Sequence, residues 1–160
     1  MPCSTEIDHP RKIIRNTYTG IITRADLGNT WLYMLGLKEF TEGRYNLGKG
    51  SLEAIQAAIR YFEAAKTRDP DFVLPVAGLA ACFTFLGGSG MMDADQAFKQ
   101  AKSYADQANL IDDGVAETHL ALAKSSFWGD WDFELTGSCI KKAIQIAPGT
   151  SAIHGFNSTY

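Results

Sequence analysis

The stretch IRYFEAAKTRDPDF, residues 59–72, carries the pattern that decides the fold. Together with the alanine before it, the stretch places Ala58 and Ala65 seven residues apart around the large Phe62, and Asp69-Pro70 follows. Proline disfavours helical backbone in the residue before it, so a helix is expected to end at about Thr67. Small residues at fixed positions allow a second helix to approach closely, and the large residue between them fills the remaining space.

The same arrangement occurs twice more. Each set has internal offsets of four, three and five residues, and corresponding positions lie 43 and then 35 residues apart. The three sets are Ala58, Phe62, Ala65 and Pro70; Ala101, Ala105, Ala108 and Asp113; and Thr136, Ile140, Ala143 and Pro148. Six residues after each closing position come Val76, His119 and His154. Gly43 is the equivalent small residue in the helical segment before the first set.

Because Ala108 is one of these small positions, we expect Ala108→Leu to overpack its site.

From residue 30 onward the chain is predicted to be all-helical. Turn residues, capping residues and prolines separate seven helical segments, because Ser and Asp favour helix starts while Gly and Pro end helices. The predicted helices are residues 30–47, 51–67, 71–86, 93–110, 115–128, 132–146 and a short segment from 151. No sustained strand pattern occurs among them.

Residues 1–28 have a different character. Two isoleucine-rich triplets flank a turn-like centre in KIIRNTYTGIITR, which favours a β-hairpin. An irregular arm lying on the helices is equally compatible with the pattern. We therefore divide the chain into an N-terminal arm, residues 1–28, and a helical repeat domain, residues 29–160.

The helical part resembles the tetratricopeptide repeat family, whose unit is a helix–turn–helix of about 34 residues with small residues at fixed positions. The segments LKEFTEGRYNLGKG, AIRYFEAAKTRDPDF and AGLAACF, with the later WDF, look like the repeat arrays of bacterial adenylate cyclases and transcriptional regulators. The resemblance implies an all-α solenoid of three hairpins plus a partial fourth. Relative to the family's unit, the turns of the hairpins carry extra residues. The third hairpin has one extra residue, which lies within FWGDWDF.

The resemblance also implies a concave groove lined by the first helix of each hairpin. Carried over by register, its residues are Phe40, Arg44, Leu74, Ala77, Ala81, Thr84, Phe85, Glu117, Leu120, Lys124, Phe127 and Trp128. Few of them are charged, which favours an apolar peptide or helix as the partner. The chain's own arm is another candidate occupant. We expect a non-enzymatic interaction or oligomerisation module, and the alternative is a sensor that holds an apolar small molecule.

The fourth repeat is incomplete. Asn157 stands where Leu79 and Leu122 stood in earlier repeats, and only a short helix follows residue 151. A solenoid is usually closed by a polar capping element. We therefore expect an apolar end at which Ile153 and Phe156 join two copies in a homodimer.

Composition bears on partners and location. The net charge is −3, which argues against nucleic acid as the main partner, because phosphate binding needs a basic surface. No apolar run approaches the roughly 20 residues of a membrane span. Cys3, Cys82 and Cys139 are far apart and form no paired motif, so a reducing, cytoplasmic setting is expected.

No motif predicts a catalytic, cofactor or metal site. GRYNLGKGS, residues 43–51, nearly matches a phosphate-binding loop, but that loop must follow a buried strand, and a hairpin turn is the better interpretation. His119 and His154 share a repeat position, with Cys139 the one soft ligand to join them, so we interpret both as helix-start residues.

Four aromatics crowd into FWGDWDF, residues 127–133. They could form a binding lip, since aromatics dominate interface hot spots. They could instead plug the turn of the third hairpin. The plug is the favoured interpretation for Trp131 and Phe133, and both interpretations stay open for Phe127 and Trp128.

Overall fold

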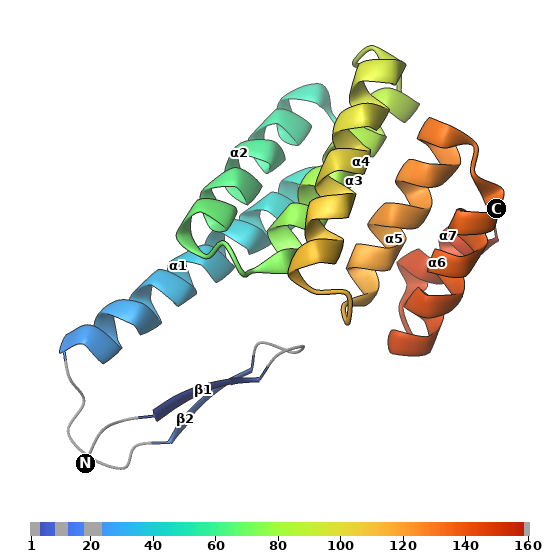
Figure 1. Cartoon of the computed structure of the whole chain (residues 1–160). Helices are drawn as coiled ribbons and strands as arrows, with labels where there is room; N and C mark the ends of the chain where they lie inside the picture. The colour runs from blue at the N-terminus through green and yellow to red at the C-terminus, as the bar shows by residue number, and fades with distance from the viewer. Residues whose placement is uncertain (1–3, 9–12, 18–23, 159–160) are drawn as a thin grey trace.

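The computed structural model describes the backbone of residues 4–8, 13–17 and 24–158, with side chains from 34 to 158. Two strands and seven α-helices occur there, with a π-helical turn η1 between α5 and α6 (Figure 1). Their bounds are β1 Ser4–Asp8, β2 Ile13–Thr17, α1 Arg24–Leu47, α2 Leu52–Arg68, α3 Val73–Gly88, α4 Ala94–Ile111, α5 Ala116–Ser125, η1 Ser126–Asp130, α6 Phe133–Ile146 and α7 Ser151–Asn157. The predicted helical character is confirmed.

Three helices begin at the capping residues that the sequence predicts. The side chain of Ser51 accepts a hydrogen bond from the backbone N–H of Ala54 at 3.2 Å. The carboxylates of Asp93 and Asp132 accept equivalent bonds at 3.0 and 2.9 Å, at the starts of α4 and α6. Each bond satisfies an N–H that the helix itself cannot pair, which explains why the chain starts helices at these points.

Helix α1 is longer than expected. It begins at Arg24, whereas the sequence predicts a start at residue 30. Gly28 lies inside the helix without ending it, because one glycine in a long helix costs only about 1 kcal/mol. Further towards the N-terminus, β1 and β2 pair antiparallel, with Ile7 opposite Ile14. This is not the predicted hairpin, in which the two isoleucine triplets pair across a turn at residues 16–20; the first triplet lies in β2 and pairs with β1 instead. Residues 24–28 of the predicted arm belong to α1, and residues 1–3, 9–12 and 18–23 lie outside the described part.

The recurrent positions of the three sets are buried in the same way. All nine small or central positions of the three sets are buried, from Ala58 in α2 to Ala143 in α6. Each set also ends its helix in the same way: the backbone N–H groups of Asp69, Asp112 and Ala147 donate to the carbonyls of the set's last alanine at 3.1, 3.0 and 2.9 Å. The sequence offsets therefore mark three equivalent helices, α2, α4 and α6.

Phe62 explains why two glycines stand on the neighbouring helices. Its ring lies so close to Gly43 in α1 and Gly78 in α3 that an added Cβ would come within 2.5 and 2.8 Å of ring atoms. Real Cβ atoms do not approach carbon that closely, so both positions need glycine while the ring is there. Phe62 thus joins the first two hairpins at their point of closest approach.

The helices pack in chain order. Helix α3 contacts α2, α4 and α5, and α5 contacts α4 and α6, so α3 and α5 each meet the helix before and the helix after them (Figure 1). The odd-numbered helices also follow one another across the molecule, since α1 contacts α3 and α3 contacts α5. This order brings one face of α1, α3, α5 and α7 together.

Ala108→Leu is expected to lower the free energy of unfolding by about 1–3 kcal/mol, the usual cost of overpacking. Ala108 is completely buried among Val76, Val115 and Ala121, with no space for three further carbons. Denaturant unfolding measures the change, with Leu110→Ala as the control because Leu110 is exposed. An unchanged midpoint for Ala108→Leu would contradict the register.

The turn of the third hairpin departs from a regular helix. The sequence predicts a helix up to residue 128, but α5 ends at Ser125 and η1 follows, with Trp131 at its end in the left-handed region at φ 55°. A π-helical turn takes one residue more than an α-helical turn. The extra residue inferred within FWGDWDF is therefore absorbed as a widened turn.

Candidate functional site

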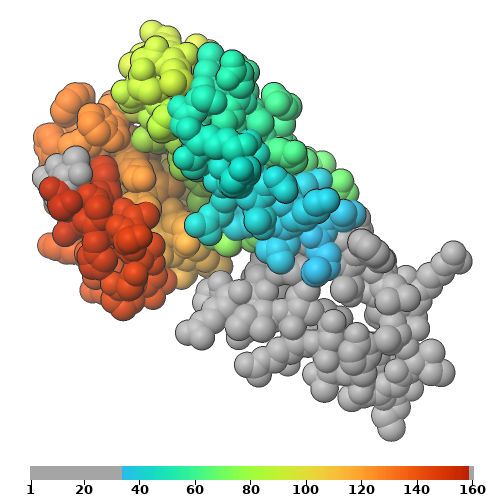
Figure 2. Space-filling view, turned by 180° about the vertical axis from the view of Figure 1, so that it is seen from behind, coloured from blue at the N-terminus to red at the C-terminus, as the bar shows by residue number. Residues whose placement is uncertain are grey.

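A pocket of about 180 Å³ lies where the odd-numbered helices meet. Figure 2 shows this face hollowed between the cyan segments of α1 and α2 and the red segments of α6 and α7. The lining residues are Phe40, Arg44, Leu47, Phe62, Leu74, Ala77, Gly78, Ala81, Glu117, Leu120, Ala121, Lys124, Thr150, Ala152 and Ile153. Most of these side chains are apolar.

The structure brings eight of the twelve predicted groove residues into this pocket. They are Phe40, Arg44, Leu74, Ala77, Ala81, Glu117, Leu120 and Lys124. The other four, Thr84, Phe85, Phe127 and Trp128, do not line it. Thr84 and Phe85 lie near the end of α3, where the hydroxyl of Thr84 donates to the carbonyl of Ala80 at 2.8 Å and Phe85 packs at Gly50. Phe127 and Trp128 belong to the π-helical turn.

Several lining residues were missed by sequence reasoning. Phe62 comes from a second helix, so a register of first helices could not find it. Ala152 could have been found, because it follows Pro148 by four residues, as Leu74 follows Pro70. Thr150 and Ile153 complete the same side, which shows that the short helix α7 is one wall of the pocket.

The charged residues of the pocket differ in their surroundings. Arg44 is exposed, and its guanidinium lies 5.9 Å from the centroid of the Phe40 ring. Glu117 is also exposed. Lys124 is partly buried, and its Nζ lies 5.8 Å from the centroid of the Phe156 ring. Burial removes the ammonium of Lys124 from water, and this desolvation lowers its pKa.

Ile153 and Phe156 face the interior of the chain, which corrects their expected role at an exposed end. Their exposed fractions are 1% and 8%. Ile153 packs with Ala116 and Ala143, and Phe156 packs in the cluster that contains Ile140. Helix α7 therefore uses both side chains to dock on α5 and α6, and its outer surface is formed by small and polar residues.

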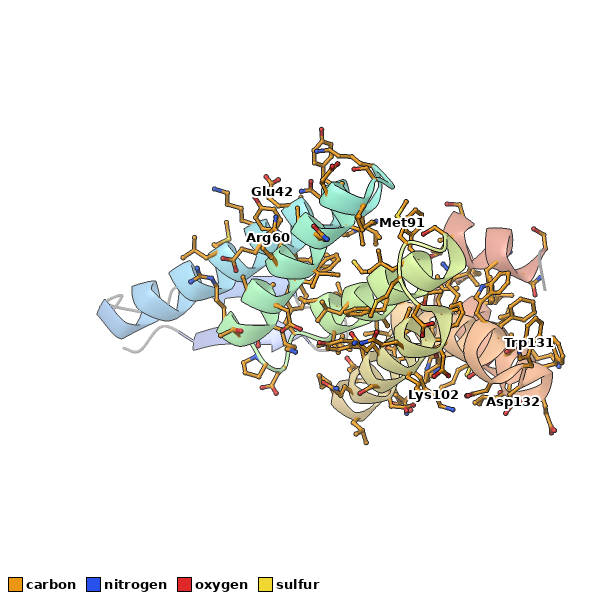
Figure 3. All side chains as sticks on the ribbon, turned by 90° about the horizontal axis from the view of Figure 1, so that it is seen from above. Glu42, Arg60, Met91, Lys102, Trp131 and Asp132 are labelled. Carbon is orange, nitrogen blue, oxygen red and sulfur yellow. The ribbon has the colours of Figure 1, made fainter. Side chains whose placement is uncertain are left out.

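The aromatic side chains of FWGDWDF surround Phe127. Ring centroids lie 4.9 Å from Phe127 for Trp128, 6.3 Å for Trp131 and 5.8 Å for Phe133, and Phe156 of α7 lies at 5.7 Å. Trp131 is 63% exposed and stands at the outer edge of the molecule (Figure 3). The outer rings thus form an exposed patch beside the turn rather than a buried plug.

The two histidines have the structural role expected of them. His119 Nε2 donates to the carbonyl of Asp113 at 2.6 Å, and His154 Nε2 donates to the carbonyl of Pro148 at 2.6 Å. A carbonyl can only accept, so Nε2 carries a proton in both rings. The identical bond at equivalent positions ties each helix start to the turn before it.

Two further candidate sites from the sequence have no counterpart in the geometry. Among the described residues, no group of three or more His, Cys, Asp or Glu side chains could hold a metal ion. The residues before Gly48 belong to α1, so the segment that resembles a phosphate-binding loop follows a helix and not a strand.

In the described part of the chain, no helix has the length and hydrophobicity needed to cross a membrane.

Comparison of the sequence with protein-family models and with curated proteins finds no match.

Proposed function

We propose that the chain is a tetratricopeptide-like α-solenoid that acts as a non-enzymatic protein-interaction module. The observation that carries the proposal is the pocket, to which α1, α3, α5 and α7 each contribute. Helices α2, α4 and α6 have buried residues at the same offsets and end with the same hydrogen bond to an alanine carbonyl, which supports the repeat interpretation. A surface that collects apolar side chains from successive helices is suited to recognise an extended or helical segment.

The proposed occupant is an amphipathic helix of a partner protein. Neighbouring helices pack about 8–10 Å apart, so four of them offer a face roughly 25–30 Å wide. A helix rises about 1.5 Å per residue, so a segment of about 16–20 residues would cross this face. The pocket would receive one large apolar side chain of that segment, since a cavity of about 150 Å³ already admits benzene.

Ala81→Phe is expected to weaken partner binding by about tenfold or more. Ala81 lines the pocket from α3 and is partly buried, so a phenyl group there would occupy the space that an anchor side chain needs. Loss of one buried anchor typically costs more than 1–2 kcal/mol of binding free energy. Helical peptides selected from a displayed library against the wild-type chain provide the ligand, and fluorescence anisotropy provides the affinity.

Phe85→Glu is the matched control on the same helix. Phe85 lies outside the pocket, so peptide affinity should stay within about twofold of the wild-type value. Both variants are first checked for an unchanged circular dichroism spectrum. Peptides that bind Ala81→Phe and wild type equally, or that lose affinity only with Phe85→Glu, would contradict the pocket as the docking site.

Self-association is a second part of the proposal. Because Ile153 and Phe156 are buried, the exposed aromatic patch formed by Trp128, Trp131 and Phe133 is the surface we propose for a homodimer contact. Exposed aromatic residues are enriched at interfaces, where they bury large areas at little conformational cost. A cytoplasmic location in a bacterium is part of the same proposal and rests on the resemblance and on the cysteine pattern.

A further inference from the structure

Lys124 in α5 is the partly buried cation of the pocket. No hydrogen bond or ion pair of Lys124 occurs within the described residues, and its Nζ lies 5.8 Å from the centroid of the Phe156 ring. Lysines on the outer surface differ: Lys66 meets Glu63 at 2.9 Å, and Lys142 meets Asp113 at 2.9 Å. Lys124 is therefore a cation in an apolar pocket wall that has no charged partner among the described residues.

Such an arrangement is costly for the folded chain. A charge that loses water without gaining a partner destabilises the fold, and the lowered pKa of Lys124 has this cause. Glu117 lies in the same pocket, yet it stands seven residues earlier on α5 and makes no ion pair with Lys124. A carboxylate supplied from outside would meet a partly desolvated cation, where charge-assisted hydrogen bonds are stronger than in water.

The apolar walls of the pocket determine which further group the ligand can carry beside its carboxylate. Phe40, Phe62, Leu74 and Leu120 present apolar surface around a volume of about 180 Å³. Apolar cavities of about 150 Å³ accept benzene, so an apolar group of phenyl size fits. Arg44 adds a second cation at the exposed side of the pocket.

We propose that the pocket binds a carboxylate joined to an apolar group of about phenyl size, with the carboxylate on Lys124 and the apolar group among the aromatic and leucine side chains. The inference rests on the proposed function in using the same groove, and it names the chemistry of the occupant. That chemistry belongs equally to a free arylalkyl acid and to a partner segment with an acidic residue beside an apolar one.

The test uses the whole chain and two matched probes, 4-phenylbutyrate and 4-phenylbutanol. Both carry the same apolar group, and only the first carries a negative charge. We expect saturable binding of the acid and at least about tenfold weaker binding of the alcohol, because a hydrogen bond to a charged group outweighs a neutral one. Calorimetry gives the affinities, and amide shifts at Ala77 and Ala81 locate the probe.

Lys124→Met should remove the preference for the acid, so that acid and alcohol bind within about twofold of each other, while Lys124→Arg should retain it. Lys141→Met, on the exposed face of α6, should leave both affinities unchanged. Lys124→Met should melt no lower than wild type because it loses an unpaired charge, so weaker binding cannot be attributed to unfolding. Equal affinities for the two probes in wild type, no saturable binding of the acid, or a preference unaffected by Lys124→Met would overturn the inference.

A third probe separates the two sources of the carboxylate. The blocked dipeptide N-acetyl-glutamyl-phenylalanine amide carries both groups on a peptide backbone. Binding at least as tight as that of 4-phenylbutyrate indicates a partner segment, and binding of the free acid alone indicates a small molecule. A selected helical peptide that binds wild type and Lys124→Met equally would overturn this inference and leave the proposed function standing.

Discussion

Phe62→Ala is expected to lower the free energy of unfolding by about 3–5 kcal/mol, the usual range for removing a buried aromatic ring. The ring is fully buried, with Gly43 and Gly78 lying against it and the side chains of its core cluster around the rest. Two glycines leave only backbone on either side, which makes collapse of the cavity difficult. Chemical denaturation followed by circular dichroism measures the loss.

Tyr61→Ala is the control for this prediction, because Tyr61 precedes Phe62 on α2 and is 38% exposed. Its cost should stay well below that of Phe62→Ala. A second variant tests the contact itself: Gly43→Ala in the Phe62→Ala background should recover part of the stability, although Gly43→Ala alone is destabilising. A double-mutant cycle with zero coupling would show that the ring does not hold α1 and α3 together.

Phe156→Ala is expected to release α7 from the body of the chain, at a cost of about 3 kcal/mol. Phe156 packs on the cluster of Ala123, Cys139 and Ile140 and against the Phe127 ring at 5.7 Å. A helix of seven residues is not stable by itself in water, so its order depends on this docking. Hydrogen exchange should become faster at the amides of α7, while the amides of α2 and α3 keep their protection.

Asn157→Ala, one residue further along α7 and exposed, should change stability by less than about 0.5 kcal/mol. Light scattering on the same samples distinguishes docking from self-association. If Phe156→Ala left the melting temperature unchanged and halved the solution mass, the side chain would belong to a dimer contact, as the sequence alone suggested. The buried position of Phe156 predicts the opposite result.

The candidate site was predictable in part. Lys124, Leu120 and Ala81 could be placed in the groove because they occupy fixed positions on first helices, and a helix with a known register presents known residues to one side. Thr84 and Phe85 were placed in the groove because the register was carried to the end of α3, whereas the pocket reaches only as far as Ala81 on that helix. Phe127 and Trp128 were misplaced for a different reason. A repeat register assumes that every helix continues regularly to its end, whereas α5 gives way to η1 at Ser126.

The unpaired state of Lys124 could not be read from the sequence either. Glu117 and Lys124 are seven residues apart on one helix, which is beyond the spacing of three or four residues at which side chains of a helix pair. Whether another helix supplies a partner to Lys124 depends on packing, as does the position of the Phe156 ring beside it. The charge of a pocket is a property of several helices, so it follows from packing and not from any one segment.

The sequence by itself determined the elements that depend on local chemistry. Ser51, Asp93 and Asp132 start helices because their side chains pair free N–H groups, and recurrent alanines set which face of α2, α4 and α6 is buried. Only the tertiary structure decided that α7 folds inward and that side chains of α1, α2, α3, α5 and α7 line one pocket. Those outcomes depend on the contacts of residues far apart in the chain, where shape and volume must fit together, and no local pattern encodes that fit.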